Sequence, residues 1–211
     1  MKVVIVDYGL GNLWSVRNAL EFFGAEVTVS SDPAVVSKSS CLILPGVGNF
    51  GSGMQNLHTR GLVDALNEAV REKGVPLLGI CLGMQLLADE SEEAPGVKGL
   101  GWIAGKVLRF RDRAVRLPHM GFNSAAASGD RKDLFALVDG EAPDFYFVHS
   151  YCFHPDDGRH VLARSTYGSE FVSAVAKDRI VGVQFHPEKS QSSGLRLIAD
   201  FLKFSAGGNH G

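Results

Sequence analysis

Cysteine is scarce in this sequence, and the few cysteines follow no familiar pattern. Three occur among 211 residues, Cys41, Cys81 and Cys152, and no two of them stand in CxxC spacing. An odd number at these distances predicts neither a disulfide framework nor a zinc site, so we expect no metal. Free thiols suit a reducing compartment, and we expect a cytoplasmic location.

A strong charge of one sign and long apolar runs are also missing. The formal net charge is −2, and the densest basic stretch, RFRDRAVR at 109–116, is interrupted by Asp112. We interpret it as the exposed edge of a strand rather than a nucleic-acid patch. The N-terminal MKVVIVDYG turns polar too early for a signal peptide, and no run approaches the length of a membrane span. We therefore expect neither nucleic acid nor membrane as a partner.

Two glycine motifs fall short of nucleotide sites. Gly9-Leu10-Gly11 follows an apolar run, but Trp14 stands where a dinucleotide fingerprint needs its third glycine. Residues 96–101 have P-loop spacing, yet Trp102 stands where the lysine belongs. We therefore expect no nucleotide cofactor.

The first half of the chain alternates short apolar runs, which predict strands, with longer amphipathic runs, which predict helices. Such alternation indicates a parallel sheet with helices on both faces. The predicted strands are 2–7, 26–30, 41–46 and 75–80, and the predicted helices are 12–24, 54–73 and one beginning at Met84.

The second half is richer in strands. Residues 171–186 predict two strands that turn at Lys177-Asp178-Arg179, a hairpin leading to His186. We predict an α/β fold with a central mixed, mostly parallel sheet flanked by helices. It forms a single domain over 1–205, with 206–211 as a disordered tail. The further predicted strands are 101–110, 142–152 and 159–165, and the last predicted helix is 194–204.

Gly79-Ile80-Cys81-Leu82-Gly83 has the pattern of a nucleophile elbow with cysteine in place of serine. The glycines allow a sharp turn in which backbone segments approach closely, and the turn exposes the sulfur at the end of a strand. A following helix would point its positive end at Cys81 and favour the reactive thiolate. The alternative is a buried structural cysteine between incidental glycines.

The segment VGVQFHPEKS supplies a candidate base. Val181, Val183 and Phe185 alternate with Gly182, Gln184 and His186, so the strand has two faces and His186 lies at its end. Glu188 can return to the same side as His186, where a carboxylate can orient the imidazole and stabilise its charged form.

The glycine-rich loop LPGVGNFGSGM at 44–54 directly follows an apolar strand. Attack on an amide carbonyl creates an oxyanion, which backbone N–H groups usually stabilise. Leu82 can give one such group, and the Val47-Gly48 region can give the second if the loop bends over Cys81. An ordinary flexible turn is the alternative.

This sequence resembles the triad-type (class I) glutamine amidotransferases. In that family the same three segments occur in the same order: a glycine-rich loop, a cysteine elbow and a His-Pro-Glu motif. Within that family the resemblance is to the glutaminase subunits of imidazole glycerol phosphate synthase, from histidine biosynthesis. It implies a flavodoxin-like α/β fold. The motifs that carry it span nearly the whole chain: VDYGLGNL, LPGVGNFG, GICLGMQLL, LPHMGFN, YFVHSY and GVQFHPEKS.

The resemblance implies that Cys81 attacks the side-chain amide of glutamine, His186 passes a proton to the departing ammonia, and Glu188 orients His186. Hydrolysis of the thioester would then give glutamate without any cofactor. For His149, a structural role at the end of a strand is the alternative. The residues implied to hold glutamine are Gln85 and Glu93 at its amino acid end, with Gly46, Gly48, His149, Ser150 and Tyr151 lining the pocket.

The resemblance also implies a heterodimer with a cyclase of (β/α)-barrel fold, which receives ammonia and makes imidazole glycerol phosphate and AICAR. Asn12, Tyr146 and Lys189 match positions at or near that interface. The PGVG loop would complete the oxyanion hole only when the loaded partner is bound. Phe122 stands where the family motif has tryptophan, which keeps an apolar ring but loses the indole N–H.

Other functions are compatible with parts of this pattern. A paralogous glutaminase subunit could supply ammonia to another synthase, such as one that amidates surface sugars. A non-catalytic regulatory binding module would not need Cys81, His186 and Glu188 together. A cysteine peptidase would need an open cleft for a peptide.

Overall fold

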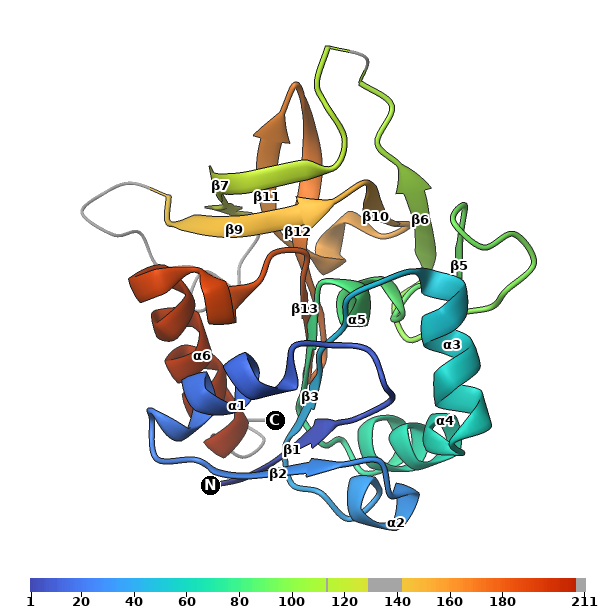
Figure 1. Ribbon diagram of the computed structural model, residues 1–211, viewed down its shortest axis with the longest axis vertical. Helices are drawn as coiled ribbons and strands as arrows, with labels where there is room; N and C mark the ends of the chain where they lie inside the picture. The colour runs from blue at the N-terminus through green and yellow to red at the C-terminus, as the bar shows by residue number, and fades with distance from the viewer. Residues whose placement is uncertain (113, 129–141, 208–211) are drawn as a thin grey trace.

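The computed structural model describes residues 1–112, 114–128 and 142–207. Within them, a mixed sheet of eight strands runs through the molecule (Figure 1). Its strands are β1 Lys2–Val6, β2 Glu26–Ser30, β3 Leu42–Leu44, β4 Leu77–Ile80, β8 Ala126–Ala127, β11 Val161–Tyr167, β12 Ser169–Lys177 and β13 Ile180–Val183. Their order across the sheet is β2-β1-β3-β4-β13-β12-β11-β8.

The sheet combines a parallel half with an antiparallel half. Strands β2, β1, β3, β4 and β13 run parallel to one another. Strand β12 runs antiparallel to β13, and β11 and β8 continue that pattern. The turn between β12 and β13 lies at Asp178, which has a φ of 52°. The predicted mixed sheet and its hairpin are confirmed.

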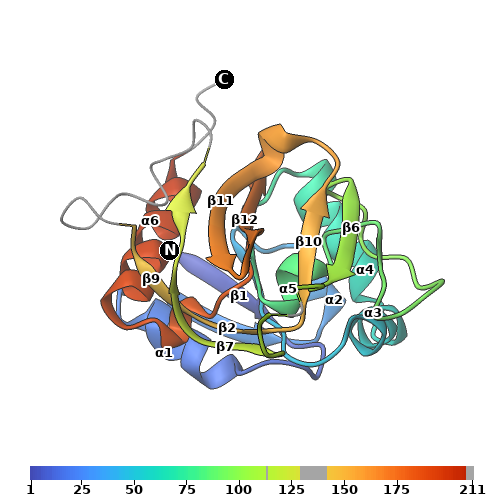
Figure 2. The same ribbon diagram turned by 90° about the horizontal axis from the view of Figure 1, so that it is seen from above.

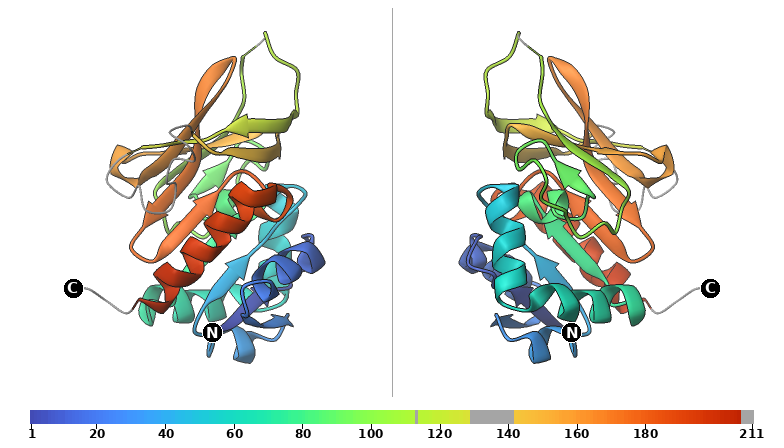
Figure 3. Two further views of the ribbon diagram at one scale, coloured as in Figure 1. Left: turned by 90° about the vertical axis from the view of Figure 1, so that its left-hand side faces the viewer. Right: turned by 90° about the vertical axis from the view of Figure 1, so that its right-hand side faces the viewer.

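Helices cover both faces of the sheet (Figure 3). The helices are α1 Leu13–Glu21, α2 Pro33–Val36, α3 Phe50–Thr59, α4 Leu62–Leu66, α5 Leu82–Gln85 and α6 Gln191–Ala206, with 3-10 turns at Gly158–His160 and Pro187–Lys189. Strand β1 illustrates why both faces of the sheet are covered. Val3 and Ile5 pack with α1 and α6 on one face, while Val4 and Val6 pack with α3 and α4 on the other. Period-two alternation therefore gives a central strand two buried faces.

Two smaller sheets lie over the end of the main sheet at which β4 and β13 finish (Figures 1 and 2). In one, β7 His119–Ser124 pairs antiparallel with β9 Asp144–His149. In the other, β6 Gly105–Arg109 lies between β10 Tyr151–Pro155 and β5 Glu90–Ser91. Ligands of open α/β sheets bind beyond the carboxyl ends of the strands, so these small sheets enclose the expected location of a site.

Three predicted elements are divided or shortened. The helix expected over 54–73 is interrupted at Gly61, whose φ is 66°, and continues as α4 and a π-helical turn at Asn67–Glu72. The strand expected over 142–152 divides at Ser150, because β9 pairs with β7 whereas β10 pairs with β6. The helix expected after Cys81 is a single turn, α5.

The end of the chain differs slightly from the prediction. Helix α6 extends to Ala206, the first residue of the predicted tail. Residues 208–211 of that tail lie outside the described part of the chain. Among the described residues, no helix combines the length and the apolar character needed to cross a membrane.

Candidate active site

Cys81 lies at the sharp turn between β4 and α5. Its φ is 53° and its ψ is −108°, a backbone conformation that is uncommon for a residue with a side chain. A Cβ added to Gly83 would lie 1.8 Å from the carbonyl oxygen of Leu44, and one on Gly79 would lie 2.8 Å from the carbonyl oxygen of Gly83. The two glycines of the predicted elbow are therefore required by close backbone packing. Because α5 is so short, its dipole contributes less to the thiolate than the sequence predicted.

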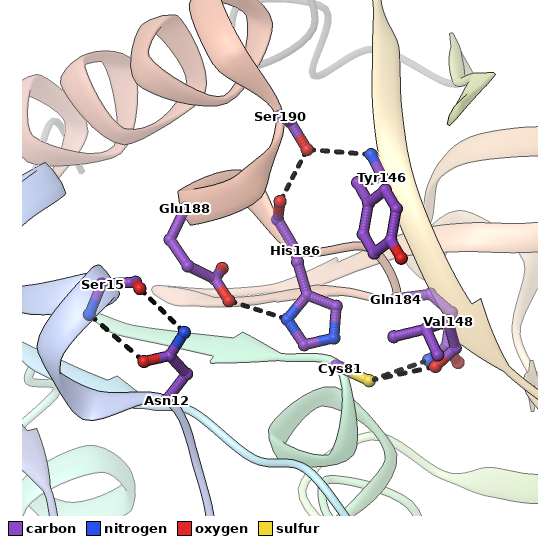
Figure 4. Close-up of polar contacts among 9 residues, drawn as sticks. All are labelled: Asn12, Ser15, Cys81, Tyr146, Val148, Gln184, His186, Glu188 and Ser190. Atoms are coloured by element: carbon purple, nitrogen blue, oxygen red, sulfur yellow. Dashed lines mark hydrogen bonds and ion pairs between the residues drawn. The ribbon is translucent and has the colours of Figure 1, made fainter. Parts of the chain in front are cut away.

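His186 and Glu188 form a buried pair beside Cys81. His186 Nδ1 lies 2.8 Å from Glu188 Oε1, and both side chains are 2% exposed. The other ring nitrogen, Nε2, faces the Cys81 side chain (Figure 4) and has no hydrogen bond of ordinary length within the described residues. Burial alone would lower the pKa of His186, but its interactions with Cys81 and Glu188 outweigh burial and raise this pKa to about 10. The arrangement therefore favours the imidazolium form of His186.

Gln184 is a site residue that the sequence did not single out. It is completely buried, its Nε2 lies 3.8 Å from Cys81 Sγ, and its Oε1 accepts from Gln85 Nε2 at 3.0 Å. The sulfur also lies 3.9 Å from the carbonyl oxygen of Val148 (Figure 4). The alternation that places Gln184 on the same strand face as His186 was a signal that could have identified it.

A cavity of about 270 Å³ opens next to the sulfur. It brings together most of the residues predicted for catalysis and binding, although Glu188 lies behind His186 and Gly46 does not reach the cavity wall. Its size, and the few polar side chains in a largely apolar lining, suit a small molecule with polar groups. The lining residues are Val47, Gly48, Cys81, Leu82, Gln85, Glu93, Pro118, Val148, His149, Ser150, Tyr151 and His186.

Gln85 and Glu93 present acceptor oxygens to this cavity. Both Nε2 hydrogens of Gln85 are used, because Nε2 donates to the carbonyl oxygen of Tyr151 at 3.1 Å and to Gln184 Oε1 at 3.0 Å. Its Oε1 is left to accept. Glu93 Oε2 accepts from the backbone N–H of Phe50 at 2.8 Å, and its second carboxylate oxygen can receive another donor. A ligand with an ammonium group fits this end of the cavity.

His149 is tied into the scaffold rather than free to react. Its Nδ1 lies 3.0 Å from the carbonyl oxygen of Tyr151, so this nitrogen carries the proton, and its Nε2 lies 3.0 Å from His119 Nδ1. The ring of His119 stacks on Tyr167 and on Phe147. Because both ring nitrogens are occupied, these contacts favour the structural role that the sequence left as an alternative for the His149 side chain.

Acid should destabilise the fold through His149. Burial lowers the pKa of His149 to about 4, whereas a histidine in an unfolded chain titrates near 6.5. Below pH 6.5 the unfolded chain binds a proton that the folded chain excludes, so the free energy of unfolding decreases until about pH 4. We expect a loss of about 3 kcal/mol from this residue across that window. Urea denaturation at several pH values measures it.

His186 has the opposite shift, and its contribution is already constant below pH 6.5, so it does not offset this loss. His149→Gln serves as the control, because its free energy of unfolding should depend less on pH between 6.5 and 4. An equal pH dependence in both proteins would contradict a buried neutral His149.

The predicted oxyanion hole is not assembled in this conformation. The backbone N–H of Leu82, one of the two expected donors, donates to the carbonyl oxygen of Gly46 at 3.4 Å. Val47 is 39% exposed, and Gly48 has a φ of 111° that favours glycine. The loop carbonyl therefore occupies the donor that an oxyanion would use, which is compatible with a hole that forms only when a partner is bound.

Two of the residues predicted for partner contact, Asn12 and Tyr146, lie near the triad (Figure 4). The side chain of Asn12 caps α1 through Ser15. The carbonyl oxygen of Tyr146 accepts from the backbone N–H of His186 at 2.8 Å. Lys189 Nζ lies 5.8 Å from the centre of the Tyr146 ring. This part of the surface is therefore in direct contact with the backbone of the candidate base.

Exposed apolar side chains adjoin this group. Phe122 is 52% exposed and Met120 is 61% exposed, both on β7. The Phe122 ring lies 5.7 Å from the ring of Tyr146. An exposed apolar patch next to the predicted contact residues is typical of a protein interface.

Comparison with known proteins agrees with this geometry. The family "Glutamine amidotransferase class-I" matches residues 4–204. The fold is shared with a crystal structure of a glutamine amidotransferase (TM-score 0.75, 22% identity, covering 97% of this chain and 99% of that one). It is shared also with the glutaminase domain of CTPS from Trypanosoma brucei (TM-score 0.65, 17% identity, covering 96% and 94%). The chain belongs to the class I glutamine amidotransferase family.

Within this family the chain is similar to proteins named imidazole glycerol phosphate synthase subunit HisH. The relative in Zymomonas mobilis is 48% identical over 209 residues, which cover 96% of each chain. A relative in Methanococcus maripaludis, subunit HisH 2, is 46% identical over 202 residues, which cover 95% of this chain and 98% of that one.

Proposed function

We propose that this protein is the glutaminase subunit of imidazole glycerol phosphate synthase. The observation that carries the proposal is the buried arrangement of Cys81, His186 and Glu188 beside a small cavity. The names of relatives more than 45% identical over nearly the whole chain support the particular synthase. A cytoplasmic location belongs to the same proposal.

The chemistry begins with attack of the Cys81 thiolate on the side-chain carbonyl carbon of glutamine. The carbonyl π electrons move to oxygen, and the tetrahedral oxyanion is stabilised by backbone N–H groups. As the oxyanion collapses, the C–N bond breaks and His186 Nε2 gives its proton to the leaving nitrogen, which departs as ammonia. The product of this half-reaction is a thioester on Cys81.

Hydrolysis of the thioester restores the site. His186, now neutral, takes a proton from water, and the resulting hydroxide attacks the thioester carbon. Collapse of the second oxyanion expels the Cys81 thiolate and leaves glutamate. The carboxylate of Glu188 stays ionised throughout, since its role is to hold Nδ1 and stabilise the imidazolium.

Glutamine recognition uses the acceptors of the cavity wall. In this proposal Gln85 Oε1 and the second oxygen of Glu93 accept from the α-ammonium group of glutamine. The backbone of 149–151 and the loop at Gly48 border the rest of the substrate. This placement orients the side-chain amide toward Cys81.

The ammonia acceptor is proposed to be a cyclase subunit of (β/α)-barrel fold that forms a heterodimer with this chain. Asn12, Tyr146 and Lys189 would lie at or near the contact, with Phe122 and Met120 supplying apolar area. Binding there would shield ammonia from solvent between the two reactions.

Reconstitution tests the proposal. The chain, the histidine-pathway cyclase and its ribulosyl substrate are mixed with glutamine, and imidazole glycerol phosphate and AICAR are measured. We expect one glutamate for each imidazole glycerol phosphate. Hydrolysis of glutamine without these products, while free ammonia supports the cyclase, would instead indicate a glutaminase that serves another synthase.

A further inference from the structure

The Gln184 carboxamide lies between the sulfur of Cys81 and the side chain of Gln85. It comes from the chain segment that joins β13 to His186, and its backbone N–H donates to the carbonyl oxygen of Ser173 on β12 at 2.9 Å. The residue has no exposed surface. Burying a carboxamide destabilises the fold unless its polar atoms form hydrogen bonds. The hydrogen bonds of Gln184 therefore contribute to stability.

The hydrogen-bond chain fixes which way this carboxamide faces. The carbonyl oxygen of Tyr151 can only accept, so the atom of Gln85 that faces it, at 3.1 Å, must be the amide nitrogen. That same nitrogen faces Gln184 at 3.0 Å and must meet an acceptor there, so the facing atom of Gln184 is Oε1. The amide nitrogen of Gln184 is then left to face the sulfur. Rotating either carboxamide by 180° would bring two donors or two acceptors together.

We propose that Gln184 is a positioning residue that donates a hydrogen bond to the Cys81 thiolate and holds the sulfur between His186 and the substrate cavity. The contact distance of 3.8 Å is appropriate to a sulfur acceptor. Hydrogen bonds to a charged group are stronger than those between neutral groups, and a buried one is little screened by solvent. The inference deepens the proposed function and rests on it.

A second contact of the sulfur explains why such a donor is needed. The carbonyl oxygen of Val148, 3.9 Å away, can accept from a neutral thiol but can only repel a thiolate. Gln184 on the adjoining side has the opposite preference, because its N–H favours the anion. The two contacts therefore bias Cys81 in opposite directions, and removing Gln184 leaves the contact that favours the neutral thiol.

Other charged or titratable groups also surround the sulfur, and a substitution at Gln184 removes none of them. Glu188 acts on it through His186, and Tyr8 and His149 belong to neighbouring strands and loops. These groups also affect the protonation of the sulfur, so the test leaves all of them unmutated. They are Tyr8 after β1, Glu93 after β5, His149 at the end of β9, and His186 and Glu188 after β13.

The test measures the thiolate directly, without glutamine. Wild type and Gln184→Leu are treated with iodoacetamide from pH 5 to 10, and alkylation of Cys81 is followed by peptide mass spectrometry. The buried Cys41 and Cys152 serve as internal references. We expect Gln184→Leu to alkylate Cys81 about tenfold more slowly at neutral pH, with the midpoint of the pH profile raised by about one unit. Gln184→Glu, which faces the sulfur with a carboxylate, should shift the midpoint further.

Ser173→Ala is the matched control, since it removes a buried hydroxyl from the strand next to Gln184 that has no hydrogen-bond partner among the described residues. It should leave the pH profile unchanged. In the complex, Gln184→Leu should lower kcat for glutamine about tenfold with little change in KM. An unchanged midpoint in folded Gln184→Leu and Gln184→Glu would overturn the proposal. A shifted midpoint in a protein that never hydrolyses glutamine would refute the proposed function and leave this role standing.

Discussion

Replacing Cys81 by alanine should reduce glutamate release in the assembled complex by at least about 10⁴-fold. Without the sulfur no thioester forms, and His186 has no nucleophile to pair with. Water in the cavity would have to attack the amide directly. Backbone donors and substrate binding accelerate this uncatalysed hydrolysis only modestly. Glutamate is measured by a coupled dehydrogenase assay in the presence of the cyclase and its ribulosyl ligand.

The matched control is Cys152→Ala. Cys152 is also buried and lies 3.8 Å from His149 Nδ1, so it too is a cysteine beside a histidine. Burial raises the pKa of Cys152 to about 12, which keeps it a neutral thiol at physiological pH. We expect Cys152→Ala to retain turnover. Loss of activity in Cys152→Ala with retention in Cys81→Ala would reverse the assignment of the nucleophile.

The second large effect is stimulation by the partner. We expect the loaded cyclase to accelerate glutamine hydrolysis by about 10²–10³, the usual contribution of one oxyanion donor. In the free chain the N–H of Leu82 is occupied by the carbonyl oxygen of Gly46, so the hole lacks that donor. Rotation of the loop peptide on complex formation would release Leu82 and turn a loop N–H toward the oxyanion.

A second reaction of the Cys81 sulfur distinguishes completion of the oxyanion hole from a general increase in the reactivity of the cysteine. Alkylation by iodoacetamide needs the thiolate but creates no oxyanion, so the partner should change its rate far less than it changes glutamine hydrolysis. Equal stimulation of both reactions would argue against gating through the loop. Glutamine hydrolysis by the free chain at the rate of the complex would argue against gating altogether.

The parallel pairing of β4 and β13 explains how much of the site the sequence could predict. Ile80 and Val183 are register partners, so Cys81, directly after β4, and His186, shortly after β13, lie beyond the same end of the sheet. Strand ends and glycine spacing indicated both residues. Their proximity depended on the two strands being neighbours, which no local pattern specifies, and only the family resemblance supplied it.

The glycine-rich loop at 44–54 shows what the sequence could not predict. The glycines around Gly46 and Gly48 allow more than one peptide orientation at similar energy, so residue types identify the loop but not the direction of its carbonyl groups. The pairing of His149 with His119 was missed for another reason. Each lies on a different strand of the β7–β9 ribbon, and the register that joins them is a tertiary property.

The left-handed backbone at Cys81 lowers the stability of the fold, while the proposed turnover requires a cysteine side chain at this position. A residue with a side chain held in such a conformation stores about 1–3 kcal/mol, which glycine at the same position would release. Thermostability selection applied to this protein without an activity assay would therefore favour loss of Cys81, the proposed nucleophile. The selected variant would have a higher melting temperature and would still bind its partner, but it would release no ammonia. A selection that measures melting temperature alone would not detect this loss.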